Sequence, residues 1–143
     1  MSTAEQIQPA ELWGVHRDDV DETWPLVRHF IDEALERGGR HTPDEVYEDL
    51  MDGKAQLWVA WGSDPVEFLG VMVTYIQRHP LSTVLRIWLC VGKDRKRWVH
   101  HLPVVEAWAK EQGCDAVVAV VRPGWEKVLT EYQKTHVTLE KTI

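Results

Sequence analysis

The amino-acid sequence predicts an α+β (α/β) fold: a mixed sheet in which an antiparallel meander leads into a parallel βαβ crossover, with helices on both faces. Three observations support this prediction. Two helical patterns occupy the first part of the chain, three strand-like runs follow without a helix between them, and the last part alternates helical and strand-like segments. Strands joined by short turns pair antiparallel, whereas a strand, a helix and a further strand are typical of a parallel crossover.

The chain opens with an edge strand and two helices. The strand is expected over residues 8–15. Apolar side chains at three- and four-residue steps then predict an amphipathic helix that ends at the glycine pair 38–39. These side chains are Trp24, Val27, Phe30, Ile31, Ala34 and Leu35. The run Thr42-Pro43-Asp44-Glu45 is a capping-box pattern with proline at the first helical position, so it predicts a second helix that Gly53 ends.

Three strands follow these helices. Residues 55–61, 68–76 and 84–91 are rich in valine, isoleucine and aromatic side chains, which favour strands. A turn around Gly62-Ser63-Asp64-Pro65 separates the first two runs, and His79-Pro80-Leu81-Ser82 separates the second from the third. This part of the sequence therefore predicts a three-stranded antiparallel meander.

A helix then crosses to a fourth, parallel strand. A proline inside a helix removes a hydrogen bond, so Pro103 indicates that the regular helix starts near Leu102, after a lead-in turn over 98–101. Residues 114–121 are almost continuously apolar, as in a strand that is buried on both faces. We expect this strand to lie parallel to the strand at 84–91.

A short helix over 125–132 and a strand over 135–141 are expected to complete the chain. With 143 residues, 44% of them hydrophobic and 27% charged, the sequence has enough apolar material for one core. We therefore expect residues 1–143 to form one domain.

Charge and cysteine content exclude several function classes. The formal charge of −7 repels nucleic acids and anionic membranes, so neither is an expected partner. The first thirty residues contain no apolar stretch typical of a signal peptide or a membrane span. Cys90 and Cys114 lie in apolar runs at opposite ends of neighbouring strands, so we expect two reduced thiols, no disulfide and a cytoplasmic protein.

Metal and serine-nucleophile chemistry have no support in the sequence. His100 and His101 are adjacent, so on a helix they point in different directions rather than toward one metal ion. The chain contains no His-Glu-x-x-His, Cys-x-x-Cys or Gly-x-Ser-x-Gly motif. The sequence therefore predicts no metal site.

The strongest candidate for a functional site is a basic turn between a strand end and a helix start. Backbone N–H groups at a helix start attract phosphate, and four cationic side chains in the turn would add to this attraction. The candidate residues for binding a phosphorylated cofactor are Val91, Gly92, Lys93, Asp94, Arg95, Lys96 and Arg97. The alternative interpretation is a solvated basic turn that binds nothing.

The order of elements and several segments resemble a known family. The segments are Gln112-Gly113-Cys114-Asp115, Arg122-Pro123-Gly124-Trp125 and the ending over 136–141, and the likeness extends back to residues 56–60. The order of elements resembles that of the GCN5-related N-acetyltransferases (GNAT). The segments resemble one group in this family, the small acetyltransferase-like proteins of tailed bacteriophages. The resemblance implies a GNAT fold and acetyl-CoA as cofactor.

The resemblance leaves two function classes open. In the family, acyl-CoA phosphates are held by a glycine-rich loop; the corresponding residues here, Gly92 to Arg97, keep one glycine. A family tyrosine in the last helix, the usual general acid, has no equivalent, because Leu129 takes its place and Tyr132 is out of step. The catalytic residues are thus unknown. The protein is either an acyl-CoA-dependent N-acyltransferase with a degenerate loop, acting on an amine in the host cytoplasm, or a noncatalytic GNAT-fold phage protein that is associated with virion proteins or with assembly.

Overall fold

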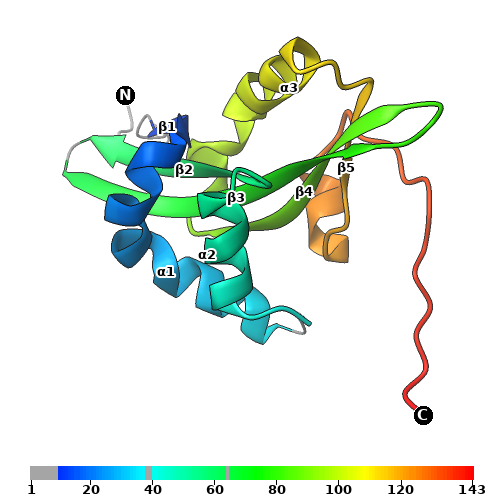
Figure 1. Ribbon diagram of the computed structural model, residues 1–143, viewed down its shortest axis with the longest axis horizontal. Coiled ribbons are helices and arrows are strands. Elements are labelled where there is room, and N and C mark those ends of the chain that lie inside the picture. The colour runs from blue at the N-terminus through cyan, green and yellow to red at the C-terminus, as the bar shows by residue number, and fades with distance from the viewer. Residues whose placement is uncertain (1–9, 38–39, 64) are drawn as a thin grey trace, which may run out of the picture.

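The computed structural model describes residues 10–37, 40–63 and 65–143 and contains one five-stranded mixed sheet (Figure 1). The strands lie in the order β1-β2-β3-β4-β5, so neighbours in the sequence are neighbours in the sheet. The first four pair antiparallel, and β4 and β5 pair parallel. The strands are β1 (Ala10–Val15), β2 (Gln56–Ser63), β3 (Val66–Arg78), β4 (Thr83–Gly92) and β5 (Ala116–Ala119). The predicted meander and parallel crossover are confirmed.

Three α-helices cover the two faces of this sheet, with α1 and α2 on one side and α3 on the other (Figure 1). They are α1 (Val20–Glu36), α2 (Pro43–Met51) and α3 (Leu102–Glu111). Short 3₁₀ helices are η2 (Arg17–Asp19), η3 (Arg95–Arg97), η4 (Val99–His101) and η5 (Pro123–Lys127). Because η3 and η4 precede α3, the predicted lead-in turn and the helix start at Leu102 are confirmed.

Each face of the sheet has its own core. Val27 and Ile31 of α1 pack with Val71 on one face, all three almost fully buried. Val105 of α3 packs with Leu85 on the other. Period-2 alternation along β3 and β4 supplies both layers, since successive side chains point to opposite faces of a sheet.

The predicted capping box at α2 forms only in part. The Thr42 hydroxyl accepts a hydrogen bond from the backbone N–H of Glu45 at 3.2 Å, and Pro43 occupies the first turn. The Glu45 carboxylate does not complete the box; its Oε2 lies 2.8 Å from Nδ1 of His41. The cap is therefore provided by Thr42, and Glu45 is engaged with a histidine.

The predicted elements at the C-terminal end are wrong in detail. Instead of a helix over 125–132, the chain forms the 3₁₀ helix η5, because Pro123 and Gly124 set a tight turn at its start. No strand forms over 135–141, where Val137 and Leu139 are exposed. A strand needs a partner to satisfy its backbone groups, and within the described residues this segment pairs with none.

The fourth strand of the prediction is longer than the one observed, whereas the N-terminal strand is confirmed over Ala10–Val15. Residues 8–9 and the glycine pair 38–39 lie outside the described residues. Of the predicted strand over 114–121, only β5 pairs with β4, and Val120 directly after it is 75% exposed. The early end of β5 is the feature that creates the candidate site.

Candidate functional site

β4 and β5 separate from each other after four paired residues. Val84–Ile87 pair with Ala116–Ala119, after which β4 continues to Gly92 without β5 beside it. At the same point β4 contains one extra residue relative to β3: Thr74 faces Ile87 and Val73 faces Leu89, so Trp88 is bulged. A bulge bends a strand and increases its twist. The bulge at Trp88 thus accompanies the opening of a slot at the end of the sheet.

Two cavities adjoin the slot, one on each face of the sheet. The cavity on the α3 face is narrow and lined only by apolar side chains and Cys90, with Leu12, Trp98 and Leu102 among them. The cavity on the α1 face is larger and open to solvent, and encloses about 590 Å³, part of it in the solvent. Four residues line both cavities, and they are Ile87, Cys90, Val121 and Trp125. These four form the walls of the slot.

The Cys90 thiol in this slot is protonated and unreactive at neutral pH. Burial raises the pKa of Cys90 to about 12, so its side chain is uncharged there. Burial also raises the pKa of Cys114, which precedes β5 at the opposite end of the strand pair. Both cysteines are free, as predicted. Cys90 therefore contributes shape and apolar surface to the slot rather than a nucleophile.

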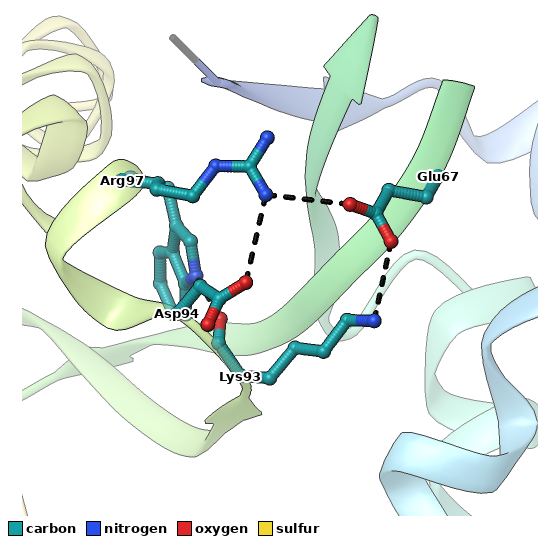
Figure 2. Close-up of polar contacts among 5 residues, drawn as sticks. Glu67, Lys93, Asp94 and Arg97 are labelled. Carbon is teal, nitrogen blue, oxygen red and sulfur yellow. Dashed lines mark hydrogen bonds and ion pairs between the residues drawn. The ribbon is translucent and has the colours of Figure 1, made fainter. Parts of the chain in front are cut away.

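The predicted cofactor residues lie at the end of β4, but they do not point in one direction. Val91 is buried, and the N–H of Lys93 donates to the carbonyl oxygen of Leu69 on β3 at 2.8 Å. The Lys93 ammonium lies 3.2 Å from Glu67, and the Arg97 guanidinium lies 3.3 Å from the other oxygen of the same carboxylate (Figure 2). Two of the four cations thus point toward the β2–β3 hairpin.

Further contacts within the turn hold this arrangement. Asp94 has a left-handed backbone conformation with φ of 52°, and its carboxylate lies 3.5 Å from Arg97 (Figure 2). Lys93 and then Arg97 lower the pKa of Glu67, which stays ionised. The carboxylates of Glu67 and Asp94 therefore offset much of the positive charge that the sequence places in this turn.

The other two cations lie on the side of the slot or in solvent. The Arg95 guanidinium lies 4.6 Å from the ring centroid of Trp125, a slot residue. Lys96 is exposed. The backbone N–H groups of Asp94, Arg95 and Lys96 begin the 3₁₀ helix η3, where no earlier carbonyl of the helix can accept from them. These three N–H groups and Arg95 are the part of the turn that is available to an anion.

Gly92 is required for a reason that the sequence did not indicate. A Cβ at Gly92 would lie 2.5 Å from the carbonyl oxygen of Leu69, and one at Gly70 would lie 2.5 Å from that of Val91. The two glycines face each other in the β3–β4 register. A Cβ at Gly70 would also lie 3.2 Å from the indole of Trp98, which is 1% exposed and donates to the Lys93 carbonyl at 3.0 Å. Gly92 thus permits close strand packing beneath Trp98.

The open mouth on the α1 face contains residues that sequence reasoning missed. Arg37, Trp88 and Arg122 line it. The ring of His41 meets the Trp88 ring edge-on at 5.0 Å, and Nδ1 of this histidine contacts Glu45. These residues are far apart in the sequence, and only the α1–α2 connection, β4 and the chain after β5 bring them together.

Comparisons with known proteins identify the fold. No protein-family model and no curated protein matches the sequence. Among solved structures, an aminoglycoside acetyltransferase, meta-AAC0020, from an uncultured soil metagenomic sample is similar with a TM-score of 0.67 and 11% identity over 94% of this chain and 96% of that one. Ribosomal-protein-alanine N-acetyltransferase from Brucella melitensis biovar Abortus 2308 has a TM-score of 0.64 and 16% identity, covering 94% and 97%. Glucosamine-6-phosphate N-acetyltransferase from Arabidopsis thaliana has a TM-score of 0.62 and 11% identity, covering 94% and 99%.

The chain has the fold of the GCN5-related N-acetyltransferases. At these identities the likeness concerns the fold. Within the part of the chain that the structure describes, no group of histidine, cysteine or carboxylate side chains is arranged to hold a metal ion. No helix in the same residues is long and apolar enough to cross a membrane.

Tyr132 is not presented to the slot of this acetyltransferase fold. Its hydroxyl donates a hydrogen bond to Glu106 of α3 at 2.6 Å. Burial, followed by this hydrogen bond, raises the pKa of the phenol. Tyr132 is half-buried against the α3 face, next to Leu129, which lines the narrow cavity. Tyr132 therefore packs the segment after η5 onto α3.

Proposed function

We propose that this protein is an N-acyltransferase that uses an acyl-CoA, acetyl-CoA in the first instance, and transfers the acyl group to an amine. One observation carries the proposal: where β4 and β5 separate, a cavity lies on each face of the sheet, and the two cavities share four wall residues. A thioester and an amine can then enter from opposite faces and meet inside the protein. Holding two reactants in contact contributes much of the rate of such reactions.

The residues at the slot fit an acyl-CoA chain. From Trp88 to Val91, the edge of β4 that faces β5 has no strand partner, so its backbone groups are available to the amides of an extended ligand. The backbone N–H groups of Asp94, Arg95 and Lys96, with the Arg95 guanidinium, are suited to phosphate. When bound, an acyl-CoA supplies a thioester that is activated toward an amine.

The protein's own contribution is to orient the amine and to accept its proton. His41 is our candidate for the second task, because Glu45 engages its Nδ1 and leaves Nε2 for a proton. The histidine itself lines neither cavity but contacts Trp88, which lines the open cavity on the amine's side. The apolar walls, including Cys90 and Trp125, exclude water from the reacting groups.

A specific observation favours the second candidate function, a noncatalytic GNAT-fold protein of a bacteriophage, associated with the virion or with its assembly. Glu67 engages Lys93 and Arg97, and the N–H of Lys93 donates to β3. These contacts engage two cations and one N–H group of the basic turn, which supports the idea of a degenerate cofactor loop. In this case the protein acts in the host cytoplasm or in the virion without binding a CoA.

Calorimetric titration with acetyl-CoA and with CoA separates the two proposals. Micromolar binding, followed by release of the CoA thiol in the presence of amines, is the expected result for an acyltransferase. Ala119→Phe narrows the slot and should abolish binding, because Ala119 lines the narrow cavity. Ala116→Phe is the matched control, since Ala116 is exposed on the same strand and lines neither cavity. Absence of binding by the parent protein would favour the noncatalytic function.

A further inference from the structure

Among the described residues that line the open cavity, the charged side chains are both positive. They are Arg37, at the end of α1, and Arg122, in the segment after β5. The rest are apolar, with Trp88 and Trp125 supplying the largest surfaces. This local charge contrasts with the formal charge of −7 on the whole chain. Such a cavity attracts an anion even though the protein as a whole repels one.

Arg122 is held at this cavity with its charge uncompensated. Its Nη2 donates to the backbone carbonyl oxygen of Arg37 at 3.0 Å, which satisfies a carbonyl at the C-terminal end of α1. Within residues 10–37, 40–63 and 65–143, no carboxylate forms an ion pair with Arg122. A guanidinium has five N–H donors, so most of those on Arg122 remain for a ligand.

Arg37 is held by a neighbour on its own helix. Its Nη2 contacts Oε1 of Glu33, one turn earlier in α1. Glu33 does not line the cavity. This ion pair uses one nitrogen of the guanidinium, so other N–H donors of Arg37 remain. Arg37 and Arg122 are neighbours, because the Arg122 guanidinium bonds to the backbone carbonyl oxygen of Arg37, and both residues line the cavity. Together they supply the positive charge and the donors that an acidic group needs.

We propose that Arg37 and Arg122 select an acceptor amine that carries a carboxylate or a phosphate. This inference rests on the proposed function, since it assigns the acidic group to the molecule that enters from the α1 face. The amine end then points toward Cys90 and the slot, and Trp88 and Trp125 contact the body of the acceptor. A polycationic amine is a poor substrate, because two arginines repel it.

Matched acceptors test this specificity. With saturating acetyl-CoA, O-phosphoethanolamine is compared with ethanolamine, and β-alanine with β-alaninamide, by release of the CoA thiol. Charge-assisted hydrogen bonds predict that the acidic member of at least one pair has a kcat/KM at least about tenfold higher. The pair that shows the preference distinguishes phosphate from carboxylate.

Two variants assign the preference to the arginines. The double variant Arg37→Met, Arg122→Met should lose the advantage of the acidic acceptor, so that the ratio of the two kcat/KM values falls to about one. Arg40→Met is the matched control, because Arg40 pairs with Glu140 and lines neither cavity. Equal kcat/KM for acidic and neutral acceptors in the parent protein would overturn the inference while the proposed function stands. Loss of acetyl-CoA affinity in the double variant would also overturn it, since the arginines would then serve the cofactor.

A binding measurement tests the anion site without catalysis. NMR signals of the tryptophan indole N–H groups report on the cavity, which contains Trp88 and Trp125. O-phosphoethanolamine should shift two of these signals in the parent protein and in Arg40→Met, but not in the double variant. If the parent protein binds no acetyl-CoA yet shows these shifts, the proposed function fails and the anion site remains. If the signals do not move in the parent protein, the anion site itself is wrong.

Discussion

The guanidinium of Arg95 lies over the indole ring of Trp125, 4.6 Å from its centroid. This contact links the basic turn after β4 to the segment after β5, on the two sides of the slot. Lys93 and Arg97 of the same turn point toward Glu67 on β3 instead (Figure 2). The four cations are therefore not equivalent: Arg95 belongs to the slot, and two others belong to the β3 side.

Arg95 should matter more for CoA binding than Lys93. Arg95→Met removes a cation beside the free N–H groups of η3, and the loss of one charge-assisted contact of about 1.5–3 kcal/mol predicts at least a tenfold increase in Kd. Calorimetric titration with CoA measures it. Lys93→Met is the matched control and should change the Kd by less than about threefold, because Glu67 already engages that ammonium. A larger effect at Lys93 would mean that Glu67 releases it to the ligand.

His41→Gln should slow acyl transfer. A general base contributes about 10²- to 10⁴-fold, and a glutamine side chain cannot accept the proton of the amine. The variant should therefore have a kcat lower by about 10²-fold, with its affinity for acetyl-CoA unchanged. Release of the CoA thiol measures the rate, and calorimetric titration measures the affinity.

His29→Gln is the control for this experiment. His29 is exposed on α1 and contacts Phe30, whereas His41 contacts Trp88 of the open cavity. The His29 variant should leave the rate unchanged. An unchanged rate for His41→Gln as well would favour the expectation from the sequence, in which no single side chain is essential as acid or base.

The sheet and its main helices could be predicted because each has a local signal. Alternation marks the strands of the meander, Thr42 caps α2, and Pro103 places the start of α3. These signals act over a few residues, and tertiary structure did not override them. The expected strand over 135–141 has the same alternating signal, but a strand also needs a partner, which the local pattern does not provide.

The slot and the pairing of the basic turn could not be predicted in this way. The slot lies where β5 ends and β4 is bulged at Trp88, and nothing in the residues around Trp88 distinguishes it from the other strand positions. Glu67 reaches Lys93, 26 residues later in the sequence, because the antiparallel pairing of β3 and β4 brings the two strand ends together. The cluster of cations in the sequence indicated a candidate site at the end of β4, which stays a prediction, and it did not indicate which cations point toward Glu67 and which toward the slot.

Thr74→Val should lower the free energy of unfolding, although valine and threonine have nearly the same shape. Nε1 of Trp58 donates to the Thr74 hydroxyl at 3.0 Å, and both residues are buried. Valine has nearly the same shape but leaves the indole N–H without a partner, which costs about 1–3 kcal/mol of unfolding free energy. Chemical denaturation measures this loss. Thr74→Ser keeps the hydroxyl and should recover most of the difference, unless the loss comes from packing.

Tyr132→Phe should leave acyl transfer almost unchanged. The phenol donates to Glu106, and its position on the α3 face keeps it out of the slot. Loss of one hydrogen bond predicts a decrease of about 0.5–1.5 kcal/mol in the unfolding free energy, with kcat within about twofold of the parent protein. A decrease in kcat of a hundredfold or more at unchanged KM would instead identify Tyr132 as a general acid.

The buried thiol of Cys90 should make the fold less stable at alkaline pH. Burial raises its pKa from 9.0 to about 12, so between these values the unfolded chain releases a proton that the folded chain retains. The contribution of the thiol to stability is complete below pH 9 and is lost as pH rises toward 12, by about 1.4 kcal/mol per pH unit. Urea denaturation at pH 8, 9, 10 and 11 measures the slope for the parent protein and for Cys90→Ala.

The comparison uses slopes rather than absolute stabilities, because Cys90→Ala also removes packing in the slot. Lysines and tyrosines titrate in the same range in every variant, so their contribution cancels in the difference. Cys114→Ala is the matched control: burial raises the pKa of that thiol too, but the larger rise belongs to Cys90. Cys90→Ala should therefore flatten the alkaline loss more than Cys114→Ala does. Equal slopes in the parent protein and Cys90→Ala would mean that the thiol ionises as readily in the folded slot as in the unfolded chain, and that water reaches it there.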